Sequence, residues 1–226
     1  MRGAVDEHDD PSWPGLVDIF AFTMVIMVFL MAFALREKSA KQVAEEGGAA
    51  AINDAAQGLR GSATDFTVRA TGKNELTLEG LESRPLSFAV NAFDLEPVQV
   101  ARLERIADAL GRLVSAHAKL LFFIDGRADP QEFHQVQAPR DNTDLSALRA
   151  AFVAKTLVRR APALERKLRV VGLGVEGEMV RPGTAAEVAA TLYAKYRRVS
   201  IRIVPDTDAL LRGDDPVRKT LEDAAR

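Results

Sequence analysis

The sequence predicts a single N-terminal transmembrane helix followed by an α+β two-layer sandwich that contains a mixed β-sheet. Two observations lead to this fold class. A continuous apolar segment lies within the first 35 residues, and short strand-like segments alternate with amphipathic helical segments from about residue 62 onward. Helices that alternate with strands bury their apolar faces against the sheet, which produces one helical layer packed on one sheet layer.

The apolar segment covers residues 13–35 (WPGLVDIFAFTMVIMVFLMAFAL) and contains one charged residue, Asp18. About 20 apolar residues are enough for a helix to cross a hydrocarbon core of roughly 30 Å. A secretory signal peptide would begin with basic residues and end at a cleavage site of small residues. The residues before this segment are acidic instead, so we expect a retained transmembrane helix.

Asp18 is the residue of this segment to which we assign a function. An ionisable side chain within a membrane costs roughly 2.5–3.5 kcal/mol at the centre of a helix, so such residues usually face a bundle interior or an ion path. A carboxylate can bind and release a proton as its surroundings change. We expect Asp18 to accept protons in a channel formed with a partner, and the alternative is a carboxylate that reaches the membrane interface without a function.

The chain is expected to have five parts. The linker between the helix and the domain is rich in Ala, Glu, Lys and Gly, and it could form a weakly amphipathic helix broken at Gly47 and Gly48. This linker is either a solvated spacer or a plug that blocks ion flow. The parts are an N-terminal tail (1–12), the transmembrane helix (13–35), the linker (36–61), the folded domain (62–205) and a polar C-terminal tail (206–226).

Within the domain, the spacing of apolar residues predicts the elements. Residues 96–115 carry Leu103, Ile106 and Leu110 on one helical face, and residues 119–124 (KLLFFI) form the continuous apolar run that is typical of a central strand. The other helices are expected at residues 144–158 and 185–196, and the other strands at 75–79, 86–90, 168–171 and 198–204.

Composition argues against several classes of function. The chain has no cysteine and three histidines, His8, His117 and His134, without a metal-ligand spacing. A GxSxG motif and a P-loop are absent from the sequence. The formal net charge of −2 does not favour nucleic acid as a partner. We therefore predict no enzyme, no cofactor and no metal site.

A set of residues between positions 126 and 153 resembles the signature of OmpA-like domains. The family pattern NxxLSxxRAxxV is matched by Asn142, Leu145, Ser146, Arg149, Ala150 and Val153. Residues 126–129 (GRAD) resemble the family's GHTD turn, and residues 197–201 (RRVSI) are similar to its terminal strand. The likeness covers about residues 85–204. It implies the OmpA C-terminal fold and binding to the diaminopimelate stem of peptidoglycan.

The resemblance assigns roles to four residues. Gly126 and Asp129 belong to the turn, Asp129 would bind the ammonium of the ligand, and Arg149 would hold its carboxylate through a bidentate guanidinium. Asn142 would position the loop or a ligand amide. The alternatives are a surface salt bridge for Arg149 and a turn or N-cap role for Asp129. The sequence departs from the family at Arg127, Ala128 and Tyr196, where the pattern has His, Thr and Asn.

An OmpA-like domain behind a helix with Trp13 and Asp18 is similar to the MotB family. This resemblance implies a self-associating subunit (a dimer) within a ring of a MotA-like membrane partner. Asp18 would carry protons or another monovalent cation, and the domain would bind peptidoglycan. The acidic N-terminus and the altered GHTD turn also resemble ZorB, the MotB-like subunit of Zorya anti-phage systems, whose partner would be a ZorA-like subunit. A flagellar stator subunit and a passive tether between membrane and peptidoglycan remain the alternatives.

The same resemblance implies the location of the chain. It predicts a single-pass protein of the bacterial inner membrane with a cytoplasmic N-terminus and a periplasmic C-terminal domain. Arg36, Lys38 and Lys41 follow the helix and favour the opposite orientation by the positive-inside rule. We give more weight to the domain, because large domains are translocated largely regardless of charge.

Overall fold

The computed structural model describes residues 12–60, 65–81, 86–131, 139–179, 181 and 183–209. The chain separates into two compact units, Met1–Val43 and Ala44–Arg226. The expected N-terminal tail lies outside the described residues except for Ser12, and most of the expected C-terminal tail does as well.

The first unit consists of the beginning of a long helix, α1 (Ser12–Arg60). Its apolar side chains are exposed within the chain, including Phe20 (72%) and Phe29 (76%). This is the one helix among the described residues that is long and apolar enough to cross a membrane. Because none of the apolar window is buried, α1 differs from the core helix of a soluble domain, and it is a candidate membrane-spanning helix.

The predicted break of the linker at Gly47 and Gly48 is wrong, because α1 continues without interruption to Arg60. Gly48 is buried, and a Cβ atom at this position would lie 2.9 Å from Cγ of Pro205. This glycine therefore permits a close contact with the domain. Beyond it, Ile52 and Leu59 belong to the hydrophobic core. Of the expected linker, residues from Ala44 onward are part of the second compact unit.

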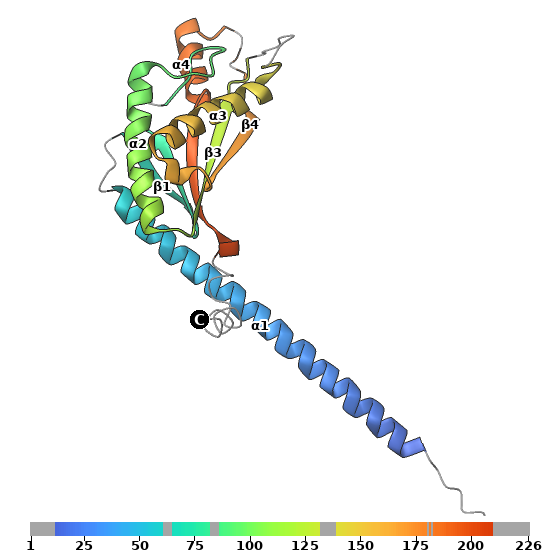
Figure 1. The fold of residues 1–226 in the computed structure, drawn as a ribbon. Coiled ribbons are helices and arrows are strands. Elements are labelled where there is room, and N and C mark those ends of the chain that lie inside the picture. Colours follow the sequence, from blue (N-terminus) through green and yellow to red (C-terminus); the bar gives the residue numbers. More distant parts are fainter. Residues whose placement is uncertain are drawn as a thin grey trace, which may run out of the picture. The chain divides into compact units, whose positions relative to one another are not determined.

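The domain contains a five-stranded mixed sheet in the order β1-β2-β5-β3-β4 (Figure 1). β3 and β4 are parallel, and the pairs β1–β2, β2–β5 and β3–β5 are antiparallel. The strands are β1 (Phe66–Gly72), β2 (Glu75–Gly80), β3 (Leu120–Ala128), β4 (Leu168–Val175) and β5 (Val199–Pro205).

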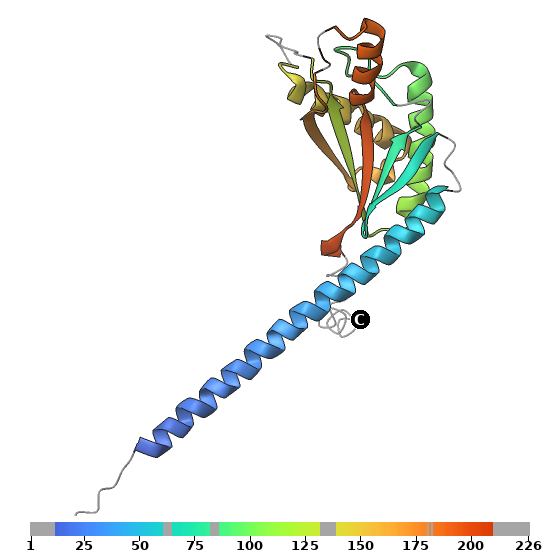
Figure 2. The same ribbon diagram turned by 180° about the vertical axis from the view of Figure 1, so that it is seen from behind.

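Two long helices, α2 (Pro97–Ala116) and α3 (Asn142–Arg160), cover one face of the sheet. They lie in front of the strands in Figure 1 and behind them in Figure 2. The core forms between these layers, where Leu103, Phe122 and Leu157 are fully buried. A short 3₁₀-helix (Pro162–Leu164) follows α3, and α4 (Ala186–Tyr196) precedes β5. The mixed sheet and the two layers agree with the fold class predicted from the sequence.

Two elements differ from the prediction. The strand expected at residues 86–90 is absent, and an isolated bridge between Ser87 and Arg198 stands in its place. In this segment the carbonyls of Phe88 and Ala89 accept from guanidinium groups, and the N–H of Phe88 donates to the backbone carbonyl of Arg197. The unpredicted strand is β1, whose side chains are mostly exposed and therefore show no clear apolar alternation.

Candidate functional site

The residues singled out by the OmpA-like motif meet at one end of the sheet, around Asp129. This residue directly follows β3, and it is 6% exposed. Its Oδ2 accepts a hydrogen bond from Nη1 of Arg197 at 2.6 Å, within a buried ion pair. Its Oδ1 accepts from the backbone N–H of Gln131 at 3.1 Å. Asp129 therefore forms the turn contact that the sequence left open as an alternative, and it also pairs with a buried arginine.

Arg149 projects from α3 into the domain and is fully buried, at 0% exposure. Its three guanidinium nitrogens donate to backbone carbonyls: Nε to Ala92 at 2.9 Å, Nη1 to Arg127 at 3.0 Å and Nη2 to Ala89 at 3.4 Å. The guanidinium also lies over the ring of Phe88, 5.2 Å from its centroid. The alternative of a surface salt bridge is therefore wrong for Arg149, because none of this side chain is exposed to solvent.

Burial has a clear electrostatic effect on Arg149. It lowers the pKa of the guanidinium to about 10, while the negative charge of Asp129 raises the pKa and the positive charge of Arg197 lowers it. The side chain is therefore still a cation at neutral pH. Since a buried cation needs compensating dipoles, the carbonyls of Ala89 and Ala92 hold the charge in place.

Asn142 begins α3 and connects the two ends of the loop that follows β3. Its Nδ2 donates to the carbonyl of Asp129 at 3.2 Å and to that of Gln131 at 2.7 Å. The neighbouring Asp141 is the N-cap, since its Oδ1 accepts from the N–H groups of Thr143 and Asp144. Asn142 thus positions the loop, and the N-cap role that was an alternative for Asp129 belongs to Asp141.

Gly126 allows α3 to approach β3 closely enough to place Arg149 in this corner. A Cβ atom on Gly126 would lie 2.1 Å from the carbonyl oxygen of Ser146 and 3.1 Å from N of Ala150. Ser146 in turn accepts a hydrogen bond at Oγ from N–H of Gly174, at 2.9 Å. The small residues of the motif therefore serve helix–strand packing, which fixes the position of the charged ones.

Arg197 is the functional candidate that sequence reasoning missed. The sequence assigns Arg197 only to the terminal-strand pattern and gives it no role in the site. In the structure it is 7% exposed and donates hydrogen bonds to Asp129 and to the carbonyl of Phe88. A paired arginine immediately before the last strand is the signal that was available. Asp18 does not belong to this cluster, because it lies with an exposed side chain on the first compact unit.

The cluster contains one carboxylate, Asp129, and two guanidinium groups, Arg149 and Arg197. These charges match a ligand that carries both an amine and a carboxylate. An incoming amine would exchange with Arg197 at Asp129, and an incoming carboxylate would exchange with the carbonyls at Arg149. Because two of the three carbonyls, those of Ala89 and Ala92, belong to the segment from Phe88 to Ala92, an exchange at them requires this segment to move.

Comparison with known proteins identifies the fold. No protein-family model and no curated protein sequence matches the chain. A MotB-like protein from Desulfovibrio vulgaris is 21% identical with a TM-score of 0.51, over 74% of this chain and 98% of that chain. The cell wall anchor of the T6SS from Pseudomonas aeruginosa is 24% identical with a TM-score of 0.47, over 66% of this chain and 96% of that chain.

The periplasmic domain of Helicobacter pylori MotB is 17% identical with a TM-score of 0.48, over 74% of this chain and 93% of that chain. The likeness to the Desulfovibrio vulgaris protein shows a shared fold. The predicted fold class, an N-terminal apolar helix followed by a two-layer domain with a mixed sheet of the MotB C-terminal type, is therefore confirmed.

Proposed function

We propose that this chain is the wall-anchored, proton-conducting subunit of an ion-driven motor complex of the MotA/MotB type. The observation that carries the proposal is a combination: a candidate membrane-spanning helix whose apolar segment contains a single carboxylate, Asp18, precedes a domain with the fold of a MotB-like protein. A passive tether between membrane and wall has no use for a costly charge in its apolar segment.

In this proposal α1 spans the bacterial inner membrane, with the N-terminus in the cytoplasm and the domain in the periplasm. Two copies of the chain associate within a ring of a MotA-like partner, and Asp18 transfers protons or another monovalent cation along the path between them. The exposed apolar side chains of α1, such as Met24 (69%) and Phe33 (65%), supply the surface that packs against partner helices and lipid.

The domain would hold the complex to peptidoglycan through the cluster around Asp129. The ammonium of the diaminopimelate stem would replace Arg197 as the partner of Asp129, and its carboxylate would bind Arg149. Asn142 would keep the loop after β3 in position for this exchange. The geometry supports this reading because Asp129, Arg149 and Arg197 lie at the same corner and have charges complementary to those of the ligand.

The acidic N-terminal residues and the GRAD turn favour the ZorB subunit of a Zorya anti-phage system, with a ZorA-like partner, over a flagellar stator subunit. Both assignments share the same mechanism at Asp18 and differ in biological output. Loss of phage resistance, with motility unchanged, is the expected result of deleting the gene under the first assignment. Loss of motility, with phage resistance unchanged, would favour the flagellar one.

Proton flux tests the central claim directly. The full chain and its MotA-like partner are reconstituted in vesicles with a pH-sensitive dye inside, and the native complex is compared with Asp18→Asn. Because asparagine is nearly isosteric but does not titrate, we expect flux to fall to the level of empty vesicles while assembly is unchanged.

The matched control is Glu37→Gln, which removes a carboxylate of α1 outside the apolar segment, where it is paired with Lys41 at 2.6 Å. This variant should conduct like the native complex. Full flux through an assembled Asp18→Asn complex would contradict the proposal and leave the passive tether as the better description.

A further inference from the structure

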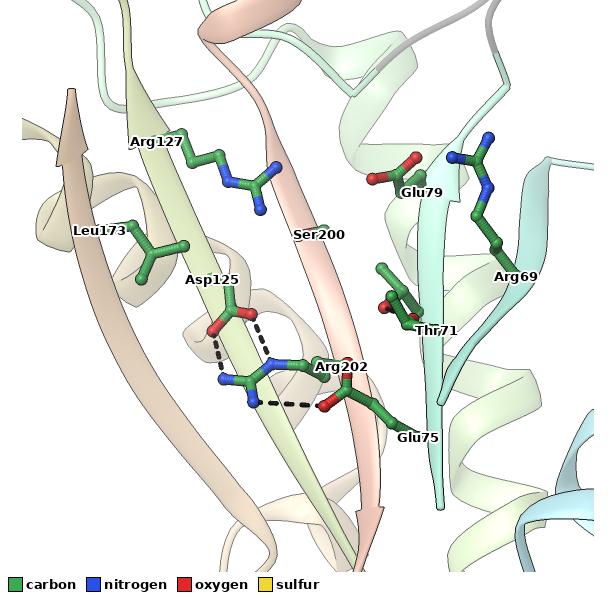
Figure 3. Close-up of a pocket in the computed structure, with 10 residues that line it drawn as sticks. Arg69, Thr71, Glu75, Glu79, Asp125, Arg127, Leu173, Ser200 and Arg202 are labelled. Atoms are coloured by element: carbon green, nitrogen blue, oxygen red, sulfur yellow. Dashed lines mark hydrogen bonds and ion pairs between the residues drawn. The ribbon is translucent and has the colours of Figure 1, made fainter. Parts of the chain in front are cut away.

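The face of the sheet opposite α2 and α3 contains a charged hollow of about 380 Å³ (Figure 3). All five strands contribute to its lining. Along β3 the side chains alternate, so that Phe122 and Ile124 are buried in the core whereas Asp125 and Arg127 line the hollow. The hollow is therefore separated by the sheet from the helical layer that carries Arg149.

One side of the hollow has a net negative charge. Arg202 donates two hydrogen bonds to Asp125, at 2.9 and 3.3 Å, and lies 3.6 Å from Oε2 of Glu75. The pKa of Arg202 is raised above its ordinary value, chiefly by the hydrogen bonds to Asp125. Two carboxylates thus share one guanidinium. The guanidinium carbon of Arg202 lies 4.9 Å from the centroid of the Phe123 ring, which is a cation–π contact.

A neighbouring group has a net positive charge. Oε1 of Glu176 lies 3.3 Å from Nη1 of Arg127 and 3.3 Å from Nη2 of Arg198, so two guanidinium groups share one carboxylate. Arg127 is the member of this group that lines the hollow. It occupies the position at which the OmpA-like pattern has a histidine, so this charge is a departure of the present chain from the family motif.

Ser200 lies between Arg127 and the carboxylate of Glu79 in Figure 3. Glu79 on β2 and Arg69 on the edge strand β1 have no salt bridge within 4.0 Å in the part of the chain that the structure describes. The carboxylate of Glu79 and the guanidinium of Arg127 line the same hollow from different sides of Ser200 in Figure 3, and the hydroxyl groups of Ser200 and Thr77 also belong to its lining.

We propose that this hollow binds a small zwitterion, namely a free amino acid or the end of a short peptide, with its carboxylate on Arg127 and its ammonium on Glu79. A guanidinium binds a carboxylate through charge-assisted hydrogen bonds, and a carboxylate does the same for an ammonium. An ion of a single sign would be attracted by one group and repelled by the other, because both groups line the same hollow.

The test measures binding to the full chain in detergent micelles by equilibrium dialysis. The probes are radiolabelled glycine and L-alanine for a free amino acid, D-alanyl-D-alanine for a peptide end, and acetate and methylamine as analogues with one charge. We expect saturable binding of at least one zwitterion with a Kd of about 1 mM or lower, and at least roughly tenfold weaker binding of acetate and methylamine. The tighter-binding probe identifies the source of the ligand.

Two variants locate the site. Arg127→Gln and Glu79→Gln should each weaken binding of the zwitterion by roughly tenfold or more, since each removes one charge partner. The matched controls Arg159→Gln and Glu104→Gln break an exposed ion pair between α3 and α2, 3.5 Å long, and should leave binding unchanged. Equal binding of acetate or methylamine, or no saturation by any zwitterion up to about 10 mM, would overturn the proposal even if a variant did not fold.

The proposal is independent of wall binding. Asp129→Asn should leave zwitterion binding unchanged, and Glu79→Gln should leave retention on purified peptidoglycan unchanged, because Asp129 lies beyond the end of β3 and does not line the hollow. If Asp129→Asn abolished zwitterion binding and Glu79→Gln had no effect, the ligand would bind at the corner of Asp129. This result would contradict the hollow as the binding site.

Discussion

Arg149 shows how a charged side chain can serve as part of a core. Its guanidinium connects α3 to two backbone segments that are distant in sequence, through the carbonyls of Ala89 and Ala92 in one and of Arg127 in the other. An arginine in this setting stabilises the fold whether or not a ligand reaches it. The sequence assigned to Arg149 a role in ligand binding, whereas its burial also makes the side chain part of the core.

We predict instead that Arg149→Ala lowers the stability of the domain by about 3 kcal/mol or more, because it leaves buried carbonyls without donors and opens a cavity. For a domain of this size the melting temperature should fall by roughly 6–12 °C. Circular dichroism of the full chain in detergent measures the change. Arg160→Ala is the control, since its partner Asp108 is on the surface, and it should shift the melting temperature by less than about 2 °C.

The charged residues of the candidate site could be predicted from the sequence because their spacing matches a motif. Asp129, Asn142 and Arg149 do meet at one corner. The motif does not predict that Asp129 and Arg149 are buried or which residues they pair with. Arg197 is 68 residues away from Asp129 in the chain, and only the antiparallel pairing of β5 with β3 brings it within 2.6 Å. Such pairing depends on the sheet register, which a single sequence does not specify.

At the scale of elements, strong apolar periodicity predicts the positions of helices and strands well, whereas the presence of glycine does not predict where a helix ends. α2, α3 and β3 lie close to their expected positions, because burial on one face imposes a regular pattern. β1 was missed because it lies at the edge of the sheet with few buried side chains. Gly47 and Gly48 were interpreted as a helix break, since glycine disfavours helices and its contact with Pro205 is not visible in the sequence.

The two adjacent glycines of α1 offer a matched pair of substitutions. Gly47→Ala should raise the stability of the domain by roughly 0.5–1 kcal/mol, because alanine favours the helix and the position is exposed. Gly48→Ala should lower stability, since its Cβ would press on the ring of Pro205 at 2.9 Å. Thermal unfolding of the two variants under identical conditions measures the difference, and equal stabilisation by both would mean that the contact with Pro205 is absent in solution.

At the scale of the whole molecule, the two proposed activities reside in different compact units. Asp18 belongs to the unit Met1–Val43, whereas Asp129 belongs to the unit Ala44–Arg226. Neither residue depends on the other for its immediate surroundings. The second unit begins at Ala44, whereas composition suggested that the domain begins near residue 62. Composition does not distinguish the two, because an Ala- and Gly-rich segment is compatible both with a solvated linker and with a helix packed on a core.

We therefore predict that the two activities can be lost one at a time. Asp18→Asn should abolish proton flux while the complex is still retained on purified peptidoglycan. Asp129→Asn should reduce retention by roughly tenfold, since it removes the charge that would pair with the ligand ammonium, and it should leave the conductance of an assembled complex unchanged. Co-sedimentation and vesicle flux measure the two quantities on the same preparations. Joint loss of both in either variant would show that the units are energetically coupled.

The packing of the last four turns of α1 has a practical consequence for anyone who dissects this chain. Ile52 and Leu59 are 2% and 1% exposed, so they are part of the hydrophobic core and do not belong to a linker that precedes it. A soluble fragment that starts at residue 62, where composition suggests the domain begins, would present the surface that these side chains cover to water and invite aggregation. A fragment intended for crystallisation or NMR should begin between residues 36 and 44, which retains the whole core and omits the apolar segment.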